Sequence, residues 1–425
     1  MLKDKRIAVI GLGYVGLPLL LELSKKFKVI GFDLFKKRIE QLKDAKDFTN
    51  EVRTKDLKSL RGFFTNKEED LIKANVYIVT VPTPINSEKE PDLTPLKMAC
   101  ESIGKYLKKK DLVIFESTVY PGLTEEFCVP ILESSSGLEM NKEFLVGYSP
   151  ERINPGDGKR KLTDIIKITS GSNAKALKLV DEIYKAIIKA GTYPVESIKV
   201  AEAAKVIENT QRDINIALVN ELSLLFKKLE IDTNKVIDAA ATKWNFLDFR
   251  PGLVGGHCIG VDPYYLTYKA KEIGFEPNMI LSGRRTNEMI PDFISKSLLQ
   301  DLKKKKVKYQ DARLLILGLT FKEDCPDIRN SKVREIYTIL KSKLSSVDVY
   351  DPYAENSDIS DNYPKESILK KMPLKKDSYD SILLAVPHKA FKKLGYNKIK
   401  DLGTDNVLFY DLKNTFPNKK ADFKL

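Results

Sequence analysis

The chain has 425 residues, a length that predicts two or three folded domains. Its hydrophobic residues, 42%, and charged residues, 31%, exclude a disordered protein. Lysine and arginine number 72 against 59 acidic residues, and the formal net charge of +13 suits anionic ligands or reflects a lysine-rich composition. Because the basic residues are spread along the chain, without a zinc-finger spacing or an RNP-like aromatic motif, we expect no nucleic-acid partner.

The four cysteines indicate a reducing environment. Cys100, Cys128, Cys258 and Cys325 are scattered, form no CxxC pair and follow no secretory signal. This pattern predicts free thiols in a cytoplasmic protein without a bound metal. The apolar stretch 15–23 is too short to cross a bilayer, so we expect no membrane partner.

The N-terminal part of the chain alternates between strand and helix patterns. Residues 6–10 (RIAVI) form an apolar run that leads into GLGYVG, and helical spacing follows it. Further strand-like runs cover residues 28–33, 76–82, 112–118 and 143–151. Repeated strand and helix alternation predicts a doubly wound parallel sheet.

The middle of the chain has a different pattern. From about Ser197 to Leu229, apolar residues recur at steps of three and four, which predicts one long helix. Such a helix needs partners on more than one side. It fits both the spine of a central domain and a dimer interface, and its apolar stripe alone does not separate these uses.

The alternation returns near residue 312. Strand-like runs cover residues 312–319, 347–352, 381–386 and 407–412, with a helix pattern after the first. The predicted fold class is therefore α/β, with two Rossmann-like doubly wound parallel-sheet domains joined by a central helical domain. We expect the domains to cover residues 1–196, 197–300 and 301–425.

A dinucleotide site is predicted at the first turn. In GLGYVG, Gly11, Gly13 and Gly16 permit a tight turn, close approach of a pyrophosphate and tight helix packing. Asp33, at the end of the second strand, is placed to accept hydrogen bonds from ribose hydroxyls, which favours NAD over NADP. A helix N-cap is the alternative for Asp33. The basic residues that follow it, including Arg38, suit an extra phosphate, a solvated helix face or a position against the adenine.

A second glycine-rich segment contains a cysteine. In GLVGGHCIGVDP (252–263), the glycines allow backbone amides to converge on a bound anion and allow Cys258 to face a cleft. From composition alone, a buried and inert thiol is the alternative. His257 is not paired with Cys258, because consecutive side chains on an extended loop diverge.

Taken together, the motifs resemble those of the UDP-glucose/UDP-mannose dehydrogenase family of nucleotide-sugar 6-dehydrogenases, over nearly the whole chain. The resemblance rests on seven segments in the family's order: IAVIGLGYVGLP (7–18), TVPTP (80–84), ESTVYPG (116–122), SPERINPGD (149–157), AEAAKVIENT (201–210), GGHCIGVDPYYL (255–266) and LGLTFKEDCPDIRNS (317–331).

The resemblance implies a four-electron oxidation of a sugar C6 alcohol to a carboxylate, with NAD as the cofactor. A bare aldehyde has no tetrahedral carbon from which a second hydride can leave. Attack by a thiolate restores that centre as a thiohemiacetal, and loss of the second hydride gives a thioester that water hydrolyses. The resemblance assigns this nucleophile to Cys258.

The family motifs also assign roles to other residues. Lys205 and Asn209 lie four apart on one helix face and match donors to the C6 oxygen, although two surface residues would show the same spacing. Lys205 also fits a general base or a group that lowers the pKa of the thiol. Asp262 and Thr118 match residues that order the hydrolytic water. Glu151 matches a carboxylate in acid/base catalysis.

The resemblance completes the binding sites, with Lys322 matching a substrate contact and Arg329 an NAD contact. The predicted cofactor contacts are Gly11, Gly13, Tyr14, Val15, Gly16, Asp33, Arg38, Thr83, Thr118 and Arg329. The predicted substrate contacts are Glu151, Arg152, Asn154, Lys205, Asn209, Arg250, Gly255, Gly256 and Lys322.

The substrate branch is suggested by two departures from the UDP-glucose enzymes. SPERINPGD replaces an SPEFLREG-like stretch, and His257 stands where an aromatic residue is usual. Both resemble the UDP-N-acetylglucosamine 6-dehydrogenases of surface-polysaccharide pathways. The N-acetylmannosamine, N-acetylgalactosamine and glucose substrates stay open, as do a two-electron dehydrogenase and a non-catalytic NAD-binding regulator. We expect a homodimer through the long helix.

Overall fold

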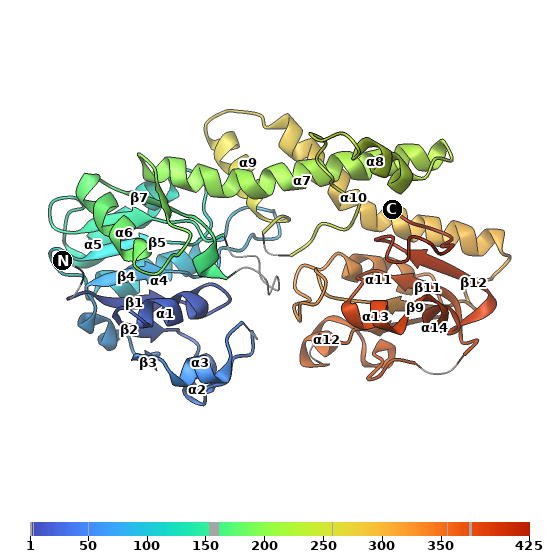
Figure 1. The fold of residues 1–425 in the computed structure, drawn as a ribbon, viewed down its shortest axis with the longest axis horizontal. Coiled ribbons are helices and arrows are strands. Elements are labelled where there is room, and N and C mark those ends of the chain that lie inside the picture. The colour runs from blue at the N-terminus through green and yellow to red at the C-terminus, as the bar shows by residue number, and fades with distance from the viewer. Residues whose placement is uncertain are drawn as a thin grey trace. The chain divides into compact units, whose positions relative to one another are not determined.

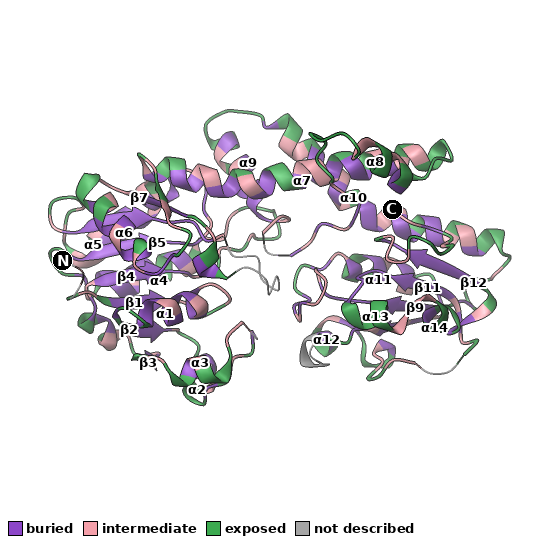
Figure 2. Ribbon diagram, in the orientation of Figure 1, coloured by how far each residue is buried: buried purple, intermediate pink, exposed green. Residues whose placement is uncertain are grey.

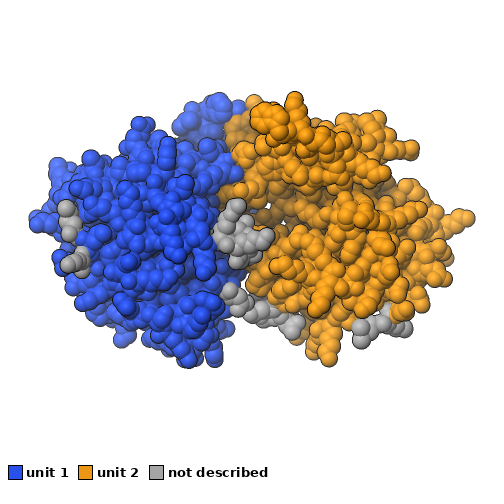
Figure 3. Space-filling model, in the orientation of Figure 1, with its two compact units in different colours: residues 1–208, 264–276 blue, residues 209–263, 277–425 orange. Residues whose placement is uncertain are grey.

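The computed structural model describes residues 2, 4–49, 51–152, 161–256, 258–354, 356–373 and 376–425. The chain forms two compact units (Figure 3). Unit 1 contains residues 1–208 and 264–276, and unit 2 contains residues 209–263 and 277–425. The buried residues of each unit gather on its sheet and on the helix faces that cover it (Figure 2).

Unit 1 is built on an eight-stranded sheet in the order β3-β2-β1-β4-β5-β6-β7-β8 (Figure 1). Its strands are β1 (Arg6–Ile10), β2 (Lys28–Phe32), β3 (Gly62–Thr65), β4 (Val76–Val79), β5 (Leu112–Phe115), β6 (Leu145–Tyr148), β7 (Lys167–Gly171) and β8 (Thr192–Pro194). The strand order reverses at β1, the point at which open α/β sheets bind nucleotides at the carboxyl ends of their strands.

The α-helices of unit 1 follow the strands along the chain. They are α1 (Gly16–Ser24), α2 (Lys36–Lys43), α3 (Thr54–Lys58), α4 (Thr94–Gly104), α5 (Val129–Ser136), α6 (Ala174–Lys185) and most of α9 (Asp262–Glu272). Helix α6 lies against β6 and β7, and its stripe of Leu179, Val180 and Ile183 is buried there. Alternating strands and helices therefore form a layered α/β unit, as predicted.

One strand pair departs from the predicted parallel arrangement. Strand β7 pairs with β6 in the antiparallel direction, with Gly147 opposite Gly171 and Tyr148 opposite Ser170. The other strand pairs of the described sheet are parallel. The reversal brings the beginning of β7 to the edge at which β5 and β6 end.

The predicted long helix is α7 (Ile198–Lys228), and it belongs to unit 1 up to Glu208 and to unit 2 from Asn209. Two further helices complete the helical part of unit 2: α8 (Thr233–Ala240) and α10 (Asn278–Lys304). Pro291 lies within α10. Buried polar groups join α7 to α10, because Arg284 donates to Asp213 at 2.7 Å and Asn287 donates to the same carboxylate at 2.7 Å.

The C-terminal part of unit 2 is a four-stranded parallel sheet in the order β10-β9-β11-β12. Its elements are β9 (Arg313–Leu317), α11 (Val333–Lys341), β10 (Ser346–Tyr350), α12 (Asn356–Asn362), β11 (Tyr379–Leu384), α13 (Lys389–Leu394), α14 (Tyr396–Lys400) and β12 (Gly403–Asp411). The second Rossmann-like sheet was predicted from its apolar runs, and the structure confirms it.

Candidate active site

The turn between β1 and α1 leaves open space beside the helix N-terminus. Gly11 has a φ of +91°, in the left-handed region that favours glycine, and its N–H donates to the Phe32 carbonyl at 2.9 Å. A Cβ on Gly16 would lie 1.9 Å from the Gly11 carbonyl oxygen, so glycine is required for this packing. A Cβ on Gly13 would meet no atom within 4 Å. The space at Gly13 therefore suits a diphosphate.

Asp33 is held at the end of β2 by two backbone groups. Its Oδ2 accepts the Leu12 N–H at 2.9 Å, and its Oδ1 accepts the Phe35 N–H at 2.9 Å. The residue before α2 is Phe35, so Asp33 is not the N-cap residue of that helix. Each carboxylate oxygen retains a lone pair, and the half-buried side chain is suited to accept the two hydroxyls of a ribose.

Arg38 bonds to the backbone of the glycine turn. Its Nε donates to the Leu12 carbonyl at 2.9 Å, its Nη2 bonds to Asp47 at 2.9 Å, and its guanidinium lies 4.4 Å from the ring centre of Phe48. The side chain is buried, so Arg38 is not one of the solvated basic residues on the outer face of α2. The other predicted cofactor residues of unit 1 are Tyr14 and Val15 in the turn, Thr83 after β4 and Thr118 after β5.

Two of the predicted catalytic residues, Thr118 and Glu151, lie just beyond the carboxyl ends of β5 and β6. These strands pair in parallel, and Thr118 and Glu151 each follow one of them by three residues. Glu151 is buried at 7% exposure. Arg152, next to it, forms an ion pair with Glu208 at 2.7 Å. Asn154 lies outside the described residues.

The cysteine loop of unit 2 brings three of the predicted catalytic residues together. The carbonyl oxygen of Cys258 accepts the N–H groups of Val261 at 3.0 Å and Asp262 at 2.8 Å, so the cysteine lies where α9 begins. Asn209 Nδ2, from α7, donates to Asp262 Oδ2 at 2.6 Å. Cys258 is half-buried, whereas the other three cysteines are buried. Of the four thiols, this one has the exposure that a nucleophile needs.

Lys205 lies on α7 one turn before Asn209, and both side chains are buried, at 7% and 5% exposure. The two therefore share a helix face, and the alternative of two surface residues does not hold. Asn209 also accepts a hydrogen bond from Arg212 at 3.2 Å through its carbonyl oxygen. Its amide orientation is thereby fixed from both sides, with the nitrogen directed at Asp262.

The glycines before Cys258 pack against the loop that follows β9. The Gly256 N–H donates to the Asn330 carbonyl at 3.1 Å, and a Cβ on Gly256 would lie 2.5 Å from the Phe321 ring. A Cβ on Gly255 would lie 2.5 Å from the same Asn330 oxygen. These glycines thus allow close approach of two loops. The amide of Gly256 is paired with protein, not directed at an anion.

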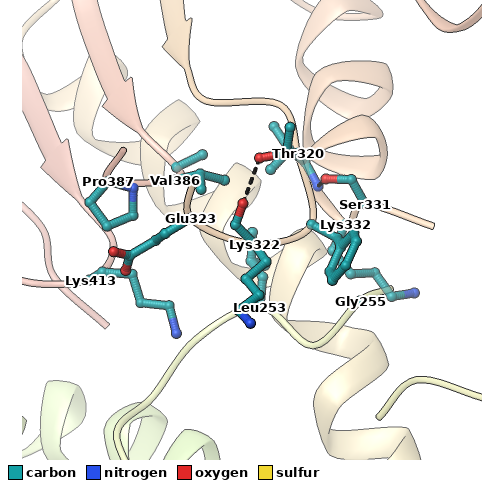
Figure 4. A pocket seen from close by; sticks show the side chains of 13 residues that line it. Leu253, Gly255, Thr320, Lys322, Glu323, Ser331, Lys332, Val386, Pro387 and Lys413 are labelled. Atoms are coloured by element: carbon teal, nitrogen blue, oxygen red, sulfur yellow. Dashed lines mark hydrogen bonds between the residues drawn. The ribbon is translucent and has the colours of Figure 1, made fainter. Parts of the chain in front are cut away.

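A cavity of about 160 Å³ opens between these loops and the segments that follow β11 and β12 (Figure 4). Lys322 borders it, and the Lys322 carbonyl accepts the Thr320 hydroxyl at 2.8 Å. Lys413, two residues after β12, also borders it, and its Nζ donates to the Pro251 carbonyl at 3.4 Å. Both amino groups extend toward the segment that carries Leu253 (Figure 4). Two lysines at one cavity suit a diphosphate, and Lys413 was not among the predicted residues.

Two predicted arginines are paired with acidic residues. Arg250 bonds to Asp238 at 2.7 Å and to Asp248 at 2.5 Å. Arg329 bonds to Asp327 at 2.6 Å, and its side chain is 60% exposed. These ion pairs fix the two loops, and each guanidinium retains exposed surface for a ligand.

The turn after β9 repeats the geometry of the first glycine turn, with one difference. Gly318 has a φ of +87°, and Asp351 accepts the Leu319 N–H at 2.6 Å, as Asp33 accepts that of Leu12. Asp351 Oδ2 is also 2.9 Å from His388 Nε2, which fills the side that a ribose would use. The second sheet thus has the fold of a dinucleotide domain without its ribose acceptor.

Comparison with known proteins identifies the whole chain. Three domain descriptions match: the NAD binding domain of the UDP-glucose/GDP-mannose dehydrogenase family at residues 5–188, its central domain at 199–289 and its UDP binding domain at 315–418. The chain belongs to the UDP-glucose/GDP-mannose dehydrogenase family. It is an NAD-dependent nucleotide-sugar dehydrogenase, and GDP-mannose, not UDP-mannose, is the second sugar nucleotide in the family's name.

Individual family members are similar over their full lengths. The chain is 52% identical to the UDP-N-acetyl-D-glucosamine 6-dehydrogenase of Salmonella typhi, covering 99% of both chains, and 52% identical to the enzyme of that name from Pseudomonas aeruginosa, covering 100% of both. The solved structure of the UDP-D-ManNAc dehydrogenase of Pyrococcus horikoshii matches with a TM-score of 0.87 at 31% identity, covering 99% of this chain and 98% of that one. Within the described ranges, no helix has the length and apolarity to span a bilayer.

Proposed function

We propose that this dehydrogenase oxidises the C6 alcohol of UDP-N-acetylglucosamine to the carboxylate through a thioester on Cys258. The observation that supports this chemistry is the position of Cys258 in unit 2, half-buried at the start of α9 and next to the Asn209 and Asp262 pair. A helix N-terminus favours negative charge, so the position suits a thiolate.

Bound NAD supplies the hydride acceptor for each of two successive two-electron oxidations. Between them, the Cys258 thiolate adds to the C6 aldehyde, and its sulfur keeps a tetrahedral carbon from which the second hydride departs. Hydrolysis then breaks the C–S bond, adds water and returns the thiol. Each turnover converts one alcohol and one water to a carboxylate, with two NAD reduced.

The neighbouring side chains have separable roles in this sequence. An amide nitrogen carries two N–H groups, and Asn209 directs one at Asp262, so we assign the other to the C6 oxygen as it becomes anionic. Lys205, on the same helix face, is the second donor to that oxygen. Asp262 and Thr118 order the hydrolytic water, and Glu151 accepts its proton.

The substrate proposal follows the degree of similarity. The two relatives at 52% identity are named for UDP-N-acetyl-D-glucosamine, whereas the UDP-N-acetyl-D-mannosamine dehydrogenase of Pyrococcus horikoshii is 34% identical over 93% of this chain. The Lys322 and Lys413 cavity is the proposed site of the UDP diphosphate. The product is an activated uronic acid, a glycosyl donor for a surface polysaccharide. We place the reaction in the cytoplasm, where a catalytic thiol stays reduced.

The stoichiometry of NADH tests the proposal. Purified enzyme with a limiting amount of each UDP-sugar should release two NADH per UDP-N-acetylglucosamine and less from the N-acetylmannosamine, N-acetylgalactosamine and glucose forms. Cys258→Ala should abolish acid formation, whereas Cys325→Ala, at a buried thiol, is the matched control. One NADH per sugar with an indifferent Cys258 would indicate a two-electron dehydrogenase. NAD binding without turnover on any of the sugars would indicate a regulator.

We further propose a homodimer through α7. Leu218 and Leu225 on this helix are 57% and 49% exposed, and they border a hollow of about 310 Å³ with Leu222 and Leu224. An apolar hollow of this kind suits a second copy of the same helix. Light scattering should give a dimer for wild type and a monomer for Leu218→Lys, with Ile273→Lys, at an exposed residue that is not part of α7, as the control. A monomeric wild type would contradict the proposal.

A further inference from the structure

A buried charged cluster lies at the carboxyl edge of the unit 1 sheet. Lys167 Nζ is 2.6 Å from Glu116 Oε2 and 3.3 Å from Glu151 Oε2. The hydroxyl of Tyr184, on α6, donates to the other oxygen of Glu116. The four residues are each 7% exposed or less. Of these, only Glu151 has a proposed part in the reaction.

The antiparallel strand explains how the cluster forms. Glu116 directly follows β5, and Glu151 lies three residues after β6, so both belong to the edge at which nucleotides bind. Tyr148 pairs with Ser170, and continuing that antiparallel register places Glu151 opposite Lys167, the first residue of β7. A parallel β7 would end at this edge, and Lys167 would lie at the far one.

The cluster contains more acid than base. Two carboxylates share one ammonium group, and the Tyr184 phenol donates to one of them. Burial raises the pKa of Glu116, although the attraction of Lys167 opposes this, and the charge of Glu151 raises it further. Burial lowers the pKa of Lys167, but the two carboxylates outweigh it and hold the pKa above its usual value. The lysine therefore stays charged, and the carboxylates compete for it.

We propose that Lys167 is a positioning residue for Glu151, keeping its side chain deprotonated and in a fixed orientation. Glu116 weakens this interaction by competing for the same ammonium group. The inference rests on the proposed role of Glu151 in thioester hydrolysis. Lys167 touches Glu151 from β7, while the N–H of Arg152 donates to Glu151 Oε1 at 2.6 Å. One carboxylate oxygen is thus fixed by the backbone and the other by the lysine.

The competition predicts that removing Lys167 and removing the charge of Glu116 shift the pH dependence of thioester decay in opposite directions. In Lys167→Met, Glu151 loses the attraction of the Lys167 ammonium group, so the acid limb of the pH dependence of thioester decay should move up by about one pH unit or more. In Glu116→Gln, Lys167 serves Glu151 alone and a neighbouring negative charge disappears, so the limb should move down. Lys167→Arg should stay near wild type. Lys185→Met, at an exposed ion pair on α6, is the control.

The experiment is a rapid-quench measurement of the thioester by intact-protein mass, from pH 5 to 9, with UDP-N-acetylglucosamine and NAD. A limb that stays in place in Glu116→Gln, or shifts of the same sign in both variants, would overturn the inference and leave only a structural role. Should Lys167→Met not fold, Glu116→Gln decides alone.

A second readout separates this inference from the proposed function. In ligand-free protein, carbon-13 NMR of labelled glutamate carboxyls, assigned with Glu151→Gln, should show Glu151 titrating at lower pH in Glu116→Gln than in wild type. An unchanged titration overturns the inference whether or not the enzyme turns over. Absence of NADH from wild type with each UDP-sugar would instead overturn the proposed function.

Discussion

Alanine at Gly16 and at Gly13 should have different effects, although the two glycines belong to one turn. The Cβ added at Gly16 would lie 1.9 Å from the Gly11 carbonyl oxygen and 2.4 Å from Thr80 Oγ1. The first of these atoms is backbone, so the helix must move. Overpacking of this kind costs about 1–3 kcal/mol, and we expect the upper end. At about 2–4 °C per kcal/mol for a domain of this size, Gly16→Ala should lower Tm by about 6–12 °C.

The same substitution at Gly13 should leave the fold intact and remove the cofactor. The new Cβ would meet no protein atom within 4 Å, so Tm should stay within about 1 °C of wild type. It would enter the space assigned to the diphosphate, and the dissociation constant for NAD should rise at least about tenfold, or 1.4 kcal/mol. Differential scanning fluorimetry and calorimetric titration with NAD measure the two effects. An unchanged NAD affinity in Gly13→Ala, or an unchanged Tm in Gly16→Ala, would refute this account of the turn.

Three further substitutions test separate parts of the site. Asp33→Ser removes the paired acceptors at the ribose position, so KM for NAD should rise about tenfold and the preference over NADP should shrink; equal KM values before and after would contradict the role. Lys322→Ala should raise KM for the UDP-sugar by about tenfold in initial-rate assays, and a rise in KM for NAD instead would contradict its assignment to the UDP-sugar site. Asn220→Leu breaks two hydrogen bonds to Gly252 and one to Asn287, so urea unfolding should show that the free energy of unfolding falls by about 2–3 kcal/mol. A fall under about 0.5 kcal/mol would show that these hydrogen bonds do not stabilise the fold.

The sheets and the long helix were predictable because their residues follow simple periods. The apolar runs of β1, β4, β5 and β9 are buried along their lengths, and α7 begins and ends within one residue of the predicted helix. Strand β7 was not predicted. Its residues KITSG carry one apolar side chain. The buried Ser170 hydroxyl donates to the Tyr148 carbonyl, and the buried Thr169 hydroxyl donates to the Asp181 carboxylate. Burial of such a strand depends on hydrogen bonds, which the hydrophobic period does not report.

In the candidate site, too, residues set by the local sequence were predictable and residues set by long-range contacts were not. Gly11, Gly16 and Asp33 were predictable because a local turn dictates each of them. Lys413 and Lys167 were not, since each reaches its neighbours through strand pairing between segments distant in sequence. The pairing of His388 with Asp351 also depends on contacts between segments distant in sequence, and it buries the histidine fully.

The covalent intermediate is the most direct test of the account. Cys258→Ser, incubated with UDP-N-acetylglucosamine and NAD, should gain the mass of the acylated sugar nucleotide, because an alkoxide leaves an acyl group less readily than a thiolate does. Intact-protein mass spectrometry should show this adduct together with a loss of steady-state turnover. An unmodified Cys258→Ser protein that still releases two NADH per sugar at the wild-type rate would contradict the role of the sulfur.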